Sequence, residues 1–285
     1  MNNINKNLNG KTIFITGATS GIGKFATIDL ALRGAVVVAA YRDFSKAESL
    51  MTEFNKQRTP ATRGLIDLLY CDLSSIASIN NACNSLKANY KSLDIVINNA
   101  GVWNWSFIKS QDGFEEIFAV NVLAPILITN NLLEIMTNKD SKLIYTASGL
   151  HWGTINFDDI EFKTSYSGYK AYQQSKLCDI VIARYYSSLL ADKGISAYSL
   201  HPGMVNTDLG RTANPIARVS FKAFGIPPEK GAETLIYLAT EDNRNLKSGE
   251  YYYHKKIAKT QAYSYDKEVA DKLINLAQNY LKHLK

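Results

Sequence analysis

Hydrophobic residues along this chain gather in short runs, and the longer segments between the runs carry them at helical spacing. Runs typical of buried strands begin near residues 11, 35, 65, 93, 142, 195 and 249. After the first run, Lys24–Arg33 repeats apolar residues on one helix face, and Gly34 is a stop signal. Strands that alternate with amphipathic helices are typical of a parallel sheet covered on both faces. The pattern therefore predicts an α/β fold with a doubly wound, mostly parallel sheet of seven strands.

The length of the chain is consistent with one domain. Its 285 residues suffice for an α/β domain with a sizeable core. No repeat, low-complexity block or linker-like change of composition divides the sequence. We therefore expect a flexible start at residues 1–9, which are rich in asparagine, and a single domain over residues 10–285.

A glycine-rich turn separates the first apolar run, Lys11–Thr16, from the helical segment that follows. Glycines allow a tight turn and a close approach of the backbone, and free N–H groups at a helix start attract a pyrophosphate. The spacing is Gly-x3-Gly-x-Gly rather than Gly-x-Gly-x-x-Gly, so an ordinary glycine-rich loop stays open as the alternative. The candidate dinucleotide-binding residues of this turn are Gly17, Ser20, Gly21, Ile22 and Gly23.

The residue that reads the cofactor ribose should lie about 20 residues beyond the glycines. Here the second apolar run ends in Tyr41 and Arg42, and the acidic Asp43 comes one step later. A guanidinium suits a 2′-phosphate, whereas a carboxylate would accept hydrogen bonds from a free 2′-hydroxyl. The sequence therefore favours NADP(H) over NAD(H) as cofactor. A surface arginine at a strand end is the alternative for Arg42.

Tyr172 and Lys176 are a candidate proton donor and its activating cation. An unperturbed phenol has a pKa near 10 and transfers protons poorly at neutral pH, but a cation four residues along a helix lowers that pKa. Tyr166 and Lys170 have the same spacing, but Gly168 lies between them and no small residue precedes the lysine. With the glycine turn, the Tyr172 pair predicts hydride exchange between a nicotinamide and a carbonyl or an alcohol.

These motifs resemble the short-chain dehydrogenase/reductase family over nearly the whole chain, and they occur in the order of that family. The resemblance implies a Rossmann-type fold and a hydride-transfer enzyme. It implies four catalytic residues: Asn121, Ser148, Tyr172 and Lys176. Besides the glycine turn and this Tyr–Lys pair, it implies cofactor contacts from Asp72 and Leu73, Asn99, Ala100 and Gly101, and Pro202, Gly203, Val205 and Thr207.

Each catalytic residue has a role that follows from its chemistry or from the resemblance. Ser148 offers a hydroxyl to the substrate oxygen, and Lys176 offers ammonium donors to the nicotinamide ribose. Asn121 anchors a water in the family that links the lysine to solvent. Taken singly, Asn121 could be a helix-interior amide, Ser148 could merely end a strand, and Tyr172 with Lys176 could be a surface pair. Together and in order, the four residues favour a catalytic site.

A narrower resemblance is to retinol dehydrogenases and WW-domain-oxidoreductase-like members of the family. It rests on Tyr41–Asp43, Ile155–Asp159 and Ala171–Leu177. It implies a preference for NADP(H) and a small hydrophobic carbonyl or alcohol as substrate, such as an aldehyde, a ketone, or a retinoid- or steroid-like molecule.

Aromatic residues lie where family members line the substrate cleft. Trp103 and Trp105 follow the Asn98–Gly101 motif, and His151 and Trp152 follow Ser148 and could form the opposite wall. Such rings suit a flat, apolar substrate, and packing under a loop is the alternative. The segment around residues 207–228 resembles the variable substrate lid of the family.

The composition of the chain limits which binding partners and which cellular compartment we expect. A net charge of +6 without a supporting motif speaks against nucleic-acid binding. Cys71, Cys83 and Cys178 show no metal spacing and leave one thiol unpaired, which favours a reducing, cytoplasmic compartment and no metal site.

We expect no integral membrane segment, because no apolar stretch reaches spanning length and the start lacks a signal-peptide core. Some retinol-dehydrogenase relatives carry an N-terminal membrane anchor, and we expect this chain to depart from them in that respect. A homodimer or a homotetramer is the assembly considered.

Two other function classes stay open at this point. One is a non-catalytic dinucleotide-binding sensor or interaction protein, which would have no need of the proton-delivery residues. The other is a sugar-nucleotide epimerase, whose glycine spacing differs and whose longer C-terminal substrate region has no counterpart here. The complete catalytic set favours an oxidoreductase.

Overall fold

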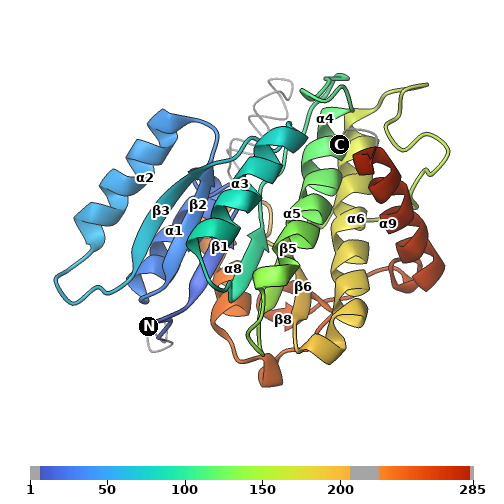
Figure 1. Cartoon of the computed structure of the whole chain (residues 1–285). Helices are drawn as coiled ribbons and strands as arrows, with labels where there is room; N and C mark the ends of the chain where they lie inside the picture. The colour runs from blue at the N-terminus through green and yellow to red at the C-terminus, as the bar shows by residue number, and fades with distance from the viewer. Residues whose placement is uncertain (1–6, 206–224, 283–285) are drawn as a thin grey trace.

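One twisted sheet runs through the computed structural model, which describes residues 7–205 and 225–282 (Figure 1). The sheet order is β3-β2-β1-β4-β5-β6-β7-β8, and the first seven strands are parallel. The predicted doubly wound, mostly parallel α/β fold is confirmed. The strands are β1 (Thr12–Ile15), β2 (Val36–Tyr41), β3 (Leu65–Tyr70), β4 (Ile95–Asn98), β5 (Lys142–Thr146), β6 (Ser196–His201), β7 (Tyr251–Tyr253) and β8 (Lys256–Ile257).

The sheet has eight strands where the sequence pattern predicts seven. The additional strand, β8, has two residues and pairs antiparallel with β7. The turn between them places His254 at φ 49° and Lys255 at φ 64°. Such hairpin turns usually carry Asn-Gly or Asp-Gly, because both central residues need positive φ. The sequence has no such signal here, and the short strand therefore escapes prediction.

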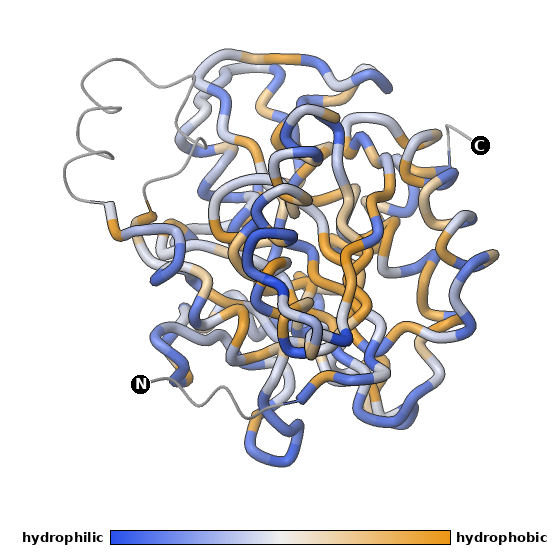
Figure 2. The backbone as a smooth tube through the Cα atoms, turned by 90° about the vertical axis from the view of Figure 1, so that its left-hand side faces the viewer, coloured by the Kyte–Doolittle hydropathy of each residue, from blue (hydrophilic) through white to orange (hydrophobic). Residues whose placement is uncertain are grey.

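Helices cover both faces of the sheet (Figure 1). Along β1, Ile13 and Ile15 pack with α1, α2 and α8, whereas Phe14 packs with α3, α5, α6 and α9. This alternation is the period of two that a strand imposes on its side chains. Figure 2 shows the hydrophobic segments gathered toward the centre of the molecule. The helices are α1 (Gly21–Leu32), α2 (Phe44–Gln57), α3 (Ile76–Asn89), α4 (Glu116–Phe118), α5 (Ala124–Leu132), α6 (Gly168–Leu189), α8 (Pro228–Thr240) and α9 (Lys267–Lys282).

The expected flexible start at residues 1–9 needs a correction where the chain is described. Leu8 is buried, and its N–H donates to the carbonyl of Arg33 at 2.9 Å. An apolar side chain between asparagines gives no periodic signal, so its burial depends on the tertiary packing of α1. Residues 1–6 lie outside the described part of the chain.

One helical run passes a length-and-composition test for a membrane span, contrary to the expectation from the sequence. It covers Glu116–Ile135, is 20 residues long, and has 72% of its most apolar window buried inside the protein. In this run α4, a π-helix at Ala119–Leu123, α5 and a short 3₁₀ turn follow one another directly. Its buried side chains include Phe118, Val122 and Leu132, which belong to the core shared with α3, α6 and α9. A core helix of this kind is as apolar as a membrane helix, so composition alone does not separate the two.

Helix α9 closes the face of the sheet that α5 and α6 cover. Its buried residues lie on one stripe, as expected for an amphipathic helix at the surface of a core: Val269, Ala270, Leu273, Ile274, Ala277 and Leu281. The ring of Tyr280 meets the edges of Phe114 and Phe118 at centroid distances of 5.3 and 5.2 Å. The C-terminal helix therefore fixes the start of α4 and the segment before it.

Truncation of Leu273 to alanine should destabilise the protein, because this side chain is fully buried in the shared core. We expect Leu273→Ala to lower the free energy of unfolding by about 2–5 kcal/mol. Asn275→Ala, at an exposed position of the same helix, should change it by less than about 0.5 kcal/mol. Urea denaturation measures both values. Equal losses in the two variants would show that α9 is not part of the cooperative core.

Candidate active site

The predicted site residues gather at the carboxyl ends of the parallel strands. In the sheet, β1 lies between β2 and β4, so the chain leaves these central strands in opposite directions. Such a point, where the strand order reverses, is the place at which open α/β sheets bind ligands. The glycine turn follows β1, the Asn98–Gly101 motif follows β4, Ser148 follows β5, and Pro202 follows β6.

The glycine turn packs directly on the segment after β4. Gly17 has φ 66°, and a Cβ added to it would lie 2.9 Å from Cα of Ala100 and from Nδ2 of Asn99. A Cβ added to Gly23 would lie 2.1 Å from the carbonyl oxygen of Gly17. Neither position has room for a side chain, so glycine is required at both.

Hydrogen bonds hold this contact between β1 and β4 in place. Oγ1 of Thr16 accepts the N–H groups of Asn99 and Ala100 at 3.0 and 3.1 Å. Nδ2 of Asn99 donates in return to the carbonyl of Thr16 at 3.0 Å. The Asn-Asn-Ala-Gly motif therefore has a structural task besides the cofactor contacts that the resemblance implies.

The start of α1 is suited to an anion. Its N-cap, Ser20, makes no side-chain cap hydrogen bond, and the first turn carries no acidic residue. The helix dipole and the N–H groups of the first turn are therefore available to a pyrophosphate. The tight glycine cradle and this helix start together fit a dinucleotide.

The described part of the loop after β6 lies close to the same turn. A Cβ added to Gly231 would lie 2.6 Å from Cγ2 of Val205 and 2.8 Å from Cγ2 of Ile22. Val205 therefore packs close to the glycine turn through the start of α8. Thr207 and most of the predicted lid at residues 207–228 lie outside the described residues.

The two candidate ribose readers behave differently. The carboxylate of Asp43 caps α2, where it accepts the N–H groups of Ser45 and Lys46 at 3.0 and 3.3 Å. Hydrogen bonds from the Ser45 side chain and the Lys46 backbone lower the pKa of Asp43. The side chain of Arg42 is 61% exposed, and its Nη1 lies 3.8 Å from Oδ1 of Asp72. The arginine is thus accessible, whereas the acid is committed to its helix.

Asp72 is a buried carboxylate that orders the loop after β3. Leu73 is the next residue of this loop. Its Oδ1 accepts the N–H and the hydroxyl of Ser74 at 3.0 and 2.8 Å, and its Oδ2 accepts Nε2 of Gln111 at 2.9 Å. These bonds fix the position of a carboxylate for which the resemblance implies a cofactor contact.

Tyr172 lies in the second turn of α6, which begins at Gly168. Tyr172 is 4% exposed, and the Ser148 side chain acts on its phenol in the direction that favours the phenolate. The indole of Trp103 stacks on its ring, with centroids 4.4 Å apart and planes 7° apart. Burial raises the pKa of Tyr172, and Lys176 and Ser148 offset only part of that rise. The lysine acts in the expected direction, but desolvation of the phenol outweighs it.

Lys176 lies one turn after Tyr172, with its Nζ 5.7 Å from the centre of the phenol ring. Nζ donates to the carbonyl of Thr146 and to Oδ2 of Asp179, both at 2.8 Å. Burial acts to lower the pKa of Lys176, but Asp179 and then Tyr172 oppose it and the pKa rises. The lysine is therefore held as a cation in a nearly dry site. The sequence analysis missed Asp179, for which the only signal was an acid three residues after a candidate lysine.

Asn121 lies in the π-helix between α4 and α5. Its Oδ1 accepts the N–H of Val102 at 2.9 Å, and its Nδ2 donates to the carbonyl of Val102 and to Oγ of Ser175 at 3.0 Å each. Single-turn π-helices are frequent at functional sites. The amide thereby ties the loop after β4 to α6, directly beside Gly101, whose added Cβ would meet both Asn121 and Lys176 at 3.4 Å.

Ser148 and the Pro202–Gly203 loop are joined by a residue that the sequence analysis did not single out. Nδ1 of His201 accepts the N–H groups of Gly149 and Gly203 at 3.1 and 3.3 Å. Burial lowers the pKa of His201 to about 4, so the ring is neutral and can accept at Nδ1. The histidine belongs to the matched motif after β6, and that position was the available signal.

In the alternative pair, Tyr166 and Lys170, the tyrosine packs against the cluster of Trp103 and Tyr172, but its hydroxyl has a structural partner. The hydroxyl of Tyr166 donates to Oε1 of Glu115 at 2.9 Å, and burial followed by Glu115 raises the pKa of this phenol. Tyr166 precedes the N-cap of α6, and Lys170 is exposed. This tyrosine has a structural partner and no cation beside it.

The candidate substrate residues fall into two groups. Trp105 stacks on Trp103 at a centroid distance of 5.3 Å and is 40% exposed, so these two rings adjoin Tyr172. His151 stacks on Trp152 at 5.1 Å and lies 4.9 Å from the ring of Tyr251. The first group therefore borders the phenol, whereas the second is linked to Ser148 through a 2.7 Å contact between Nδ1 of His151 and the Ser148 carbonyl.

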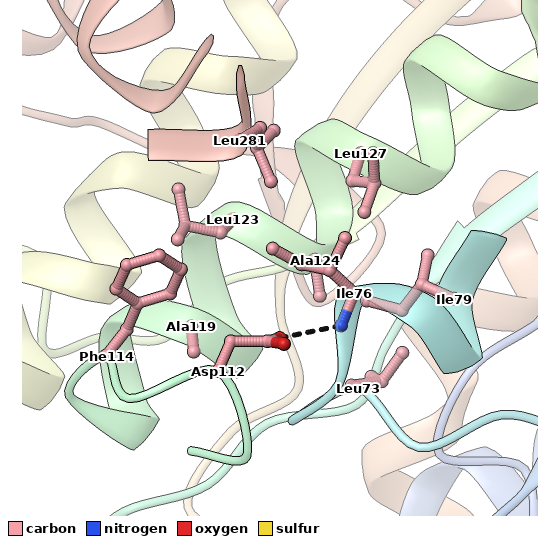
Figure 3. A pocket seen from close by; sticks show the side chains of 10 residues that line it. All are labelled: Leu73, Ile76, Ile79, Asp112, Phe114, Ala119, Leu123, Ala124, Leu127 and Leu281. Atoms are coloured by element: carbon pink, nitrogen blue, oxygen red, sulfur yellow. Dashed lines mark hydrogen bonds between the residues drawn. The ribbon is translucent and has the colours of Figure 1, made fainter. Parts of the chain in front are cut away.

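An apolar hollow elsewhere in the fold is no candidate ligand site. Figure 3 shows its side chains where the end of α9 meets α3 and α5. Its volume of about 10 Å³ has room for roughly one water molecule, and its acid, Asp112, already accepts the N–H of Ile76 at 2.7 Å. Within residues 7–205 and 225–282, no cluster of three His, Cys, Asp or Glu side chains could hold a metal ion.

Comparison with known proteins agrees with this geometry. The family model "short chain dehydrogenase" matches residues 11–216. Mouse retinol dehydrogenase 14 is 34% identical over 95% of this chain and 86% of its own length. Human polyprenol dehydrogenase is 31% identical over 92% and 82%. A crystal structure of an uncharacterised protein from Mycobacterium paratuberculosis superposes with a TM-score of 0.78 at 25% identity, covering 97% of this chain and 95% of the other.

The resemblance to retinol dehydrogenases is thus confirmed at high coverage. The fold, the glycine cradle and the matched motifs occur together in one chain. The chain belongs to the short-chain dehydrogenase family and is a hydride-transfer oxidoreductase that uses a nicotinamide dinucleotide.

Proposed function

We propose that this protein is an NADP(H)-dependent oxidoreductase for hydrophobic carbonyls and alcohols. The observation that carries the proposal is the buried phenol of Tyr172, which is stacked on Trp103 and lies one helical turn from the Lys176 ammonium. A dinucleotide-binding sensor would not need a proton donor with its own cation at this place.

The chain's own residues hold the cofactor and manage the proton. The glycine turn and the start of α1 receive the pyrophosphate, and Asn99–Gly101 and Pro202–Val205 border the nicotinamide side. The bound nicotinamide supplies or accepts the hydride. Tyr172 donates a proton to the oxygen of a carbonyl substrate, or accepts one from an alcohol. Ser148 donates a hydrogen bond to the same oxygen, and Lys176 stabilises the phenolate that remains.

The preference for NADP(H) is supported by the two residues after β2. Arg42 offers an accessible guanidinium, which can pair with a 2′-phosphate by charge-assisted hydrogen bonds. Asp43, which could serve a free 2′-hydroxyl, is engaged as the N-cap of α2. Because Arg42 is accessible and Asp43 is engaged in capping α2, the end of β2 favours NADP(H) over NAD(H).

The hydrophobic substrate class is supported by the rings around Tyr172. Trp103 and Trp105 form a stacked pair of which the outer ring is partly exposed. Apolar surface of this kind contributes to binding by removing the substrate from water. Two relatives are named for retinol and for polyprenol, which are both long apolar alcohols. We extend that substrate class to this chain, with retinoid- or steroid-like carbonyls among the candidates.

The three thiols support a proposal about the compartment. Cys71, Cys83 and Cys178 are buried and free, and burial raises the pKa of Cys71 and Cys83 to about 12. We propose a reducing, cytoplasmic compartment for the protein, because nothing in its described core depends on a disulfide.

Tyr172→Phe should abolish most turnover and leave cofactor binding intact. Loss of the proton donor should lower kcat for an aldehyde by at least about 10²-fold, since general acid catalysis contributes 10²–10⁴-fold. NADPH binding, measured by the change in its fluorescence, should persist because the glycine turn is unchanged. Tyr166→Phe is the matched control and should keep its activity. Loss of activity in Tyr166→Phe with retention in Tyr172→Phe would reverse the assignment.

Arg42→Asp should weaken NADPH far more than NADH. A guanidinium paired with the 2′-phosphate becomes a repelling carboxylate, and loss of a charged hydrogen bond costs roughly 1.5–3 kcal/mol. That corresponds to about one to two decades in Kd, which calorimetry measures for both cofactors. Arg58→Asp, the same charge reversal at the other end of α2, should leave the ratio of the two affinities unchanged. Equal affinity for NADPH and NADH in the unmutated protein would contradict the preference.

Turnover should rise with the length of an apolar substrate. Each buried methylene contributes about 0.8 kcal/mol, so kcat/KM should climb along a series of straight-chain aldehydes until the cleft is full. Trp105→Ala should flatten the climb and leave the smallest aldehyde nearly unaffected. The same measurement on Trp152→Ala tests whether the His151 and Trp152 pair also borders the substrate. A flat series in the unmutated protein would rule out the hydrophobic substrate class.

A further inference from the structure

Asp179 is a buried carboxylate beside the active-site lysine, and the reaction as described makes no use of it. Its Oδ2 accepts a hydrogen bond from Nζ of Lys176 at 2.8 Å, and the two side chains are only 4% and 5% exposed. An exposed ion pair at this spacing would have little effect, because water and salt screen it. A buried charge acts on its neighbours much more strongly, since little water lies between them.

The Lys176 ammonium therefore lies close to two acidic groups, the carboxyl of Asp179 and the phenol of Tyr172. Of the three N–H donors of Lys176, one goes to the carbonyl of Thr146 and one to Asp179. The ammonium also lies 5.7 Å from the centre of the Tyr172 ring, and its charge favours the phenolate. Asp179 balances part of the positive charge of Lys176, and this charge therefore stabilises the phenolate of Tyr172 less strongly.

We propose that Asp179 is a positioning residue that keeps Lys176 protonated and balances its charge, so that Tyr172 holds its proton and acts as a donor to carbonyls. The proposal rests on the proposed function, because it assigns Tyr172 and Lys176 the roles given above. It goes beyond the proposed function by naming a fifth side chain, Asp179, that sets the pH range of the reaction.

The sign of the effect follows from counting formal charges. With Asp179 ionised, Tyr172, Lys176 and Asp179 together are neutral when the phenol is protonated and carry one negative charge when it is not. Without the carboxylate, the same ionisation starts from a positive site and ends at a neutral one. A proton leaves a positive site more easily, so removal of the carboxylate should lower the pKa of Tyr172. In agreement, Asp179 contributes to raising that pKa in this structure.

The effect has a lower pH limit. Burial raises the pKa of Asp179 to about 6, against the opposing effect of Lys176. Asp179 balances the lysine only above that pH, where it is ionised. Tyr145 on β5 and Cys178 on α6 also face this charge, but burial raises the pKa of both, and they are neutral in the working range. Neither group can replace the carboxylate.

A fluorescence titration tests the proposal without any substrate. Trp103 stacks on Tyr172, so ionisation of the phenol should quench its emission. The chain has only 3 tryptophans, which limits the background. Emission against pH is recorded for the unmutated protein and for Asp179→Asn, each with and without Tyr172→Phe. The step that disappears in the Tyr172→Phe background belongs to Tyr172. We expect Asp179→Asn to move that step down by about one pH unit or more.

Two further variants separate charge from packing. Asp179→Glu keeps the charge and should leave the step near its original pH, whereas Asp192→Asn removes an exposed charge after α6 and should not move it. Asp179→Ser tests the same loss of charge where Asp179→Asn does not fold. An unchanged step in the folded neutral variant, or an equal shift in Asp179→Glu, would overturn the proposal.

Kinetics provide the second readout. In Asp179→Asn, the acidic limb of kcat/KM for NADP⁺-dependent alcohol oxidation should move to lower pH by the same amount, because oxidation needs the phenolate. Carbonyl reduction should fall off at a correspondingly lower pH. A shifted step in a protein that turns over no carbonyl would reject the proposed function and keep the role of Asp179. Active enzymes with identical pH profiles would reject the role of Asp179 alone.

Discussion

The site depends on the close approach of two chain segments, at the ends of the neighbouring strands β1 and β4. Gly17 and Gly23 leave no room for side chains, and Thr16 and Asn99 exchange hydrogen bonds across the gap. This contact brings the glycine turn and the Asn98–Gly101 motif to one place. A side chain at either glycine would push the turn away from β4 and shift the start of α1 with it.

The catalytic helix is aligned to that junction through a single amide. Asn121 bonds both polar groups of Val102, just after the β4 motif, and also Ser175 on α6. The π-helix makes this reach possible by widening one turn inside an otherwise regular helical run. Because α6 is long and packed along the core, its orientation is rigid. The positions of Tyr172 and Lys176 relative to the cofactor turn therefore depend on packing far from the chemistry.

Most of the architecture could be predicted from local patterns, because parallel strands and their covering helices have clear periodicities. The glycine turn and the Tyr172 pair were also predictable, since each function needs specific residue types at fixed spacing. The pairing of Asp179 with the lysine, the link made by His201 and the hairpin at β8 could not be foreseen. Each depends on contacts between segments or on backbone angles that no short pattern records. The apolar helix at Glu116–Ile135 shows the same limit, because burial and membrane insertion select similar compositions.

The chemistry of the site is a balance between desolvation and charge. Trp103 and the surrounding core exclude water from Tyr172, which favours the neutral phenol and thus a group able to give a proton. Lys176 acts in the opposite direction and stabilises the phenolate once the proton has left. Neither effect alone yields a useful catalyst, because a phenol that is only buried would not release its proton, and one that faces an unbalanced cation would already have lost it. Any bound molecule that excluded further water from Tyr172 would strengthen both effects together.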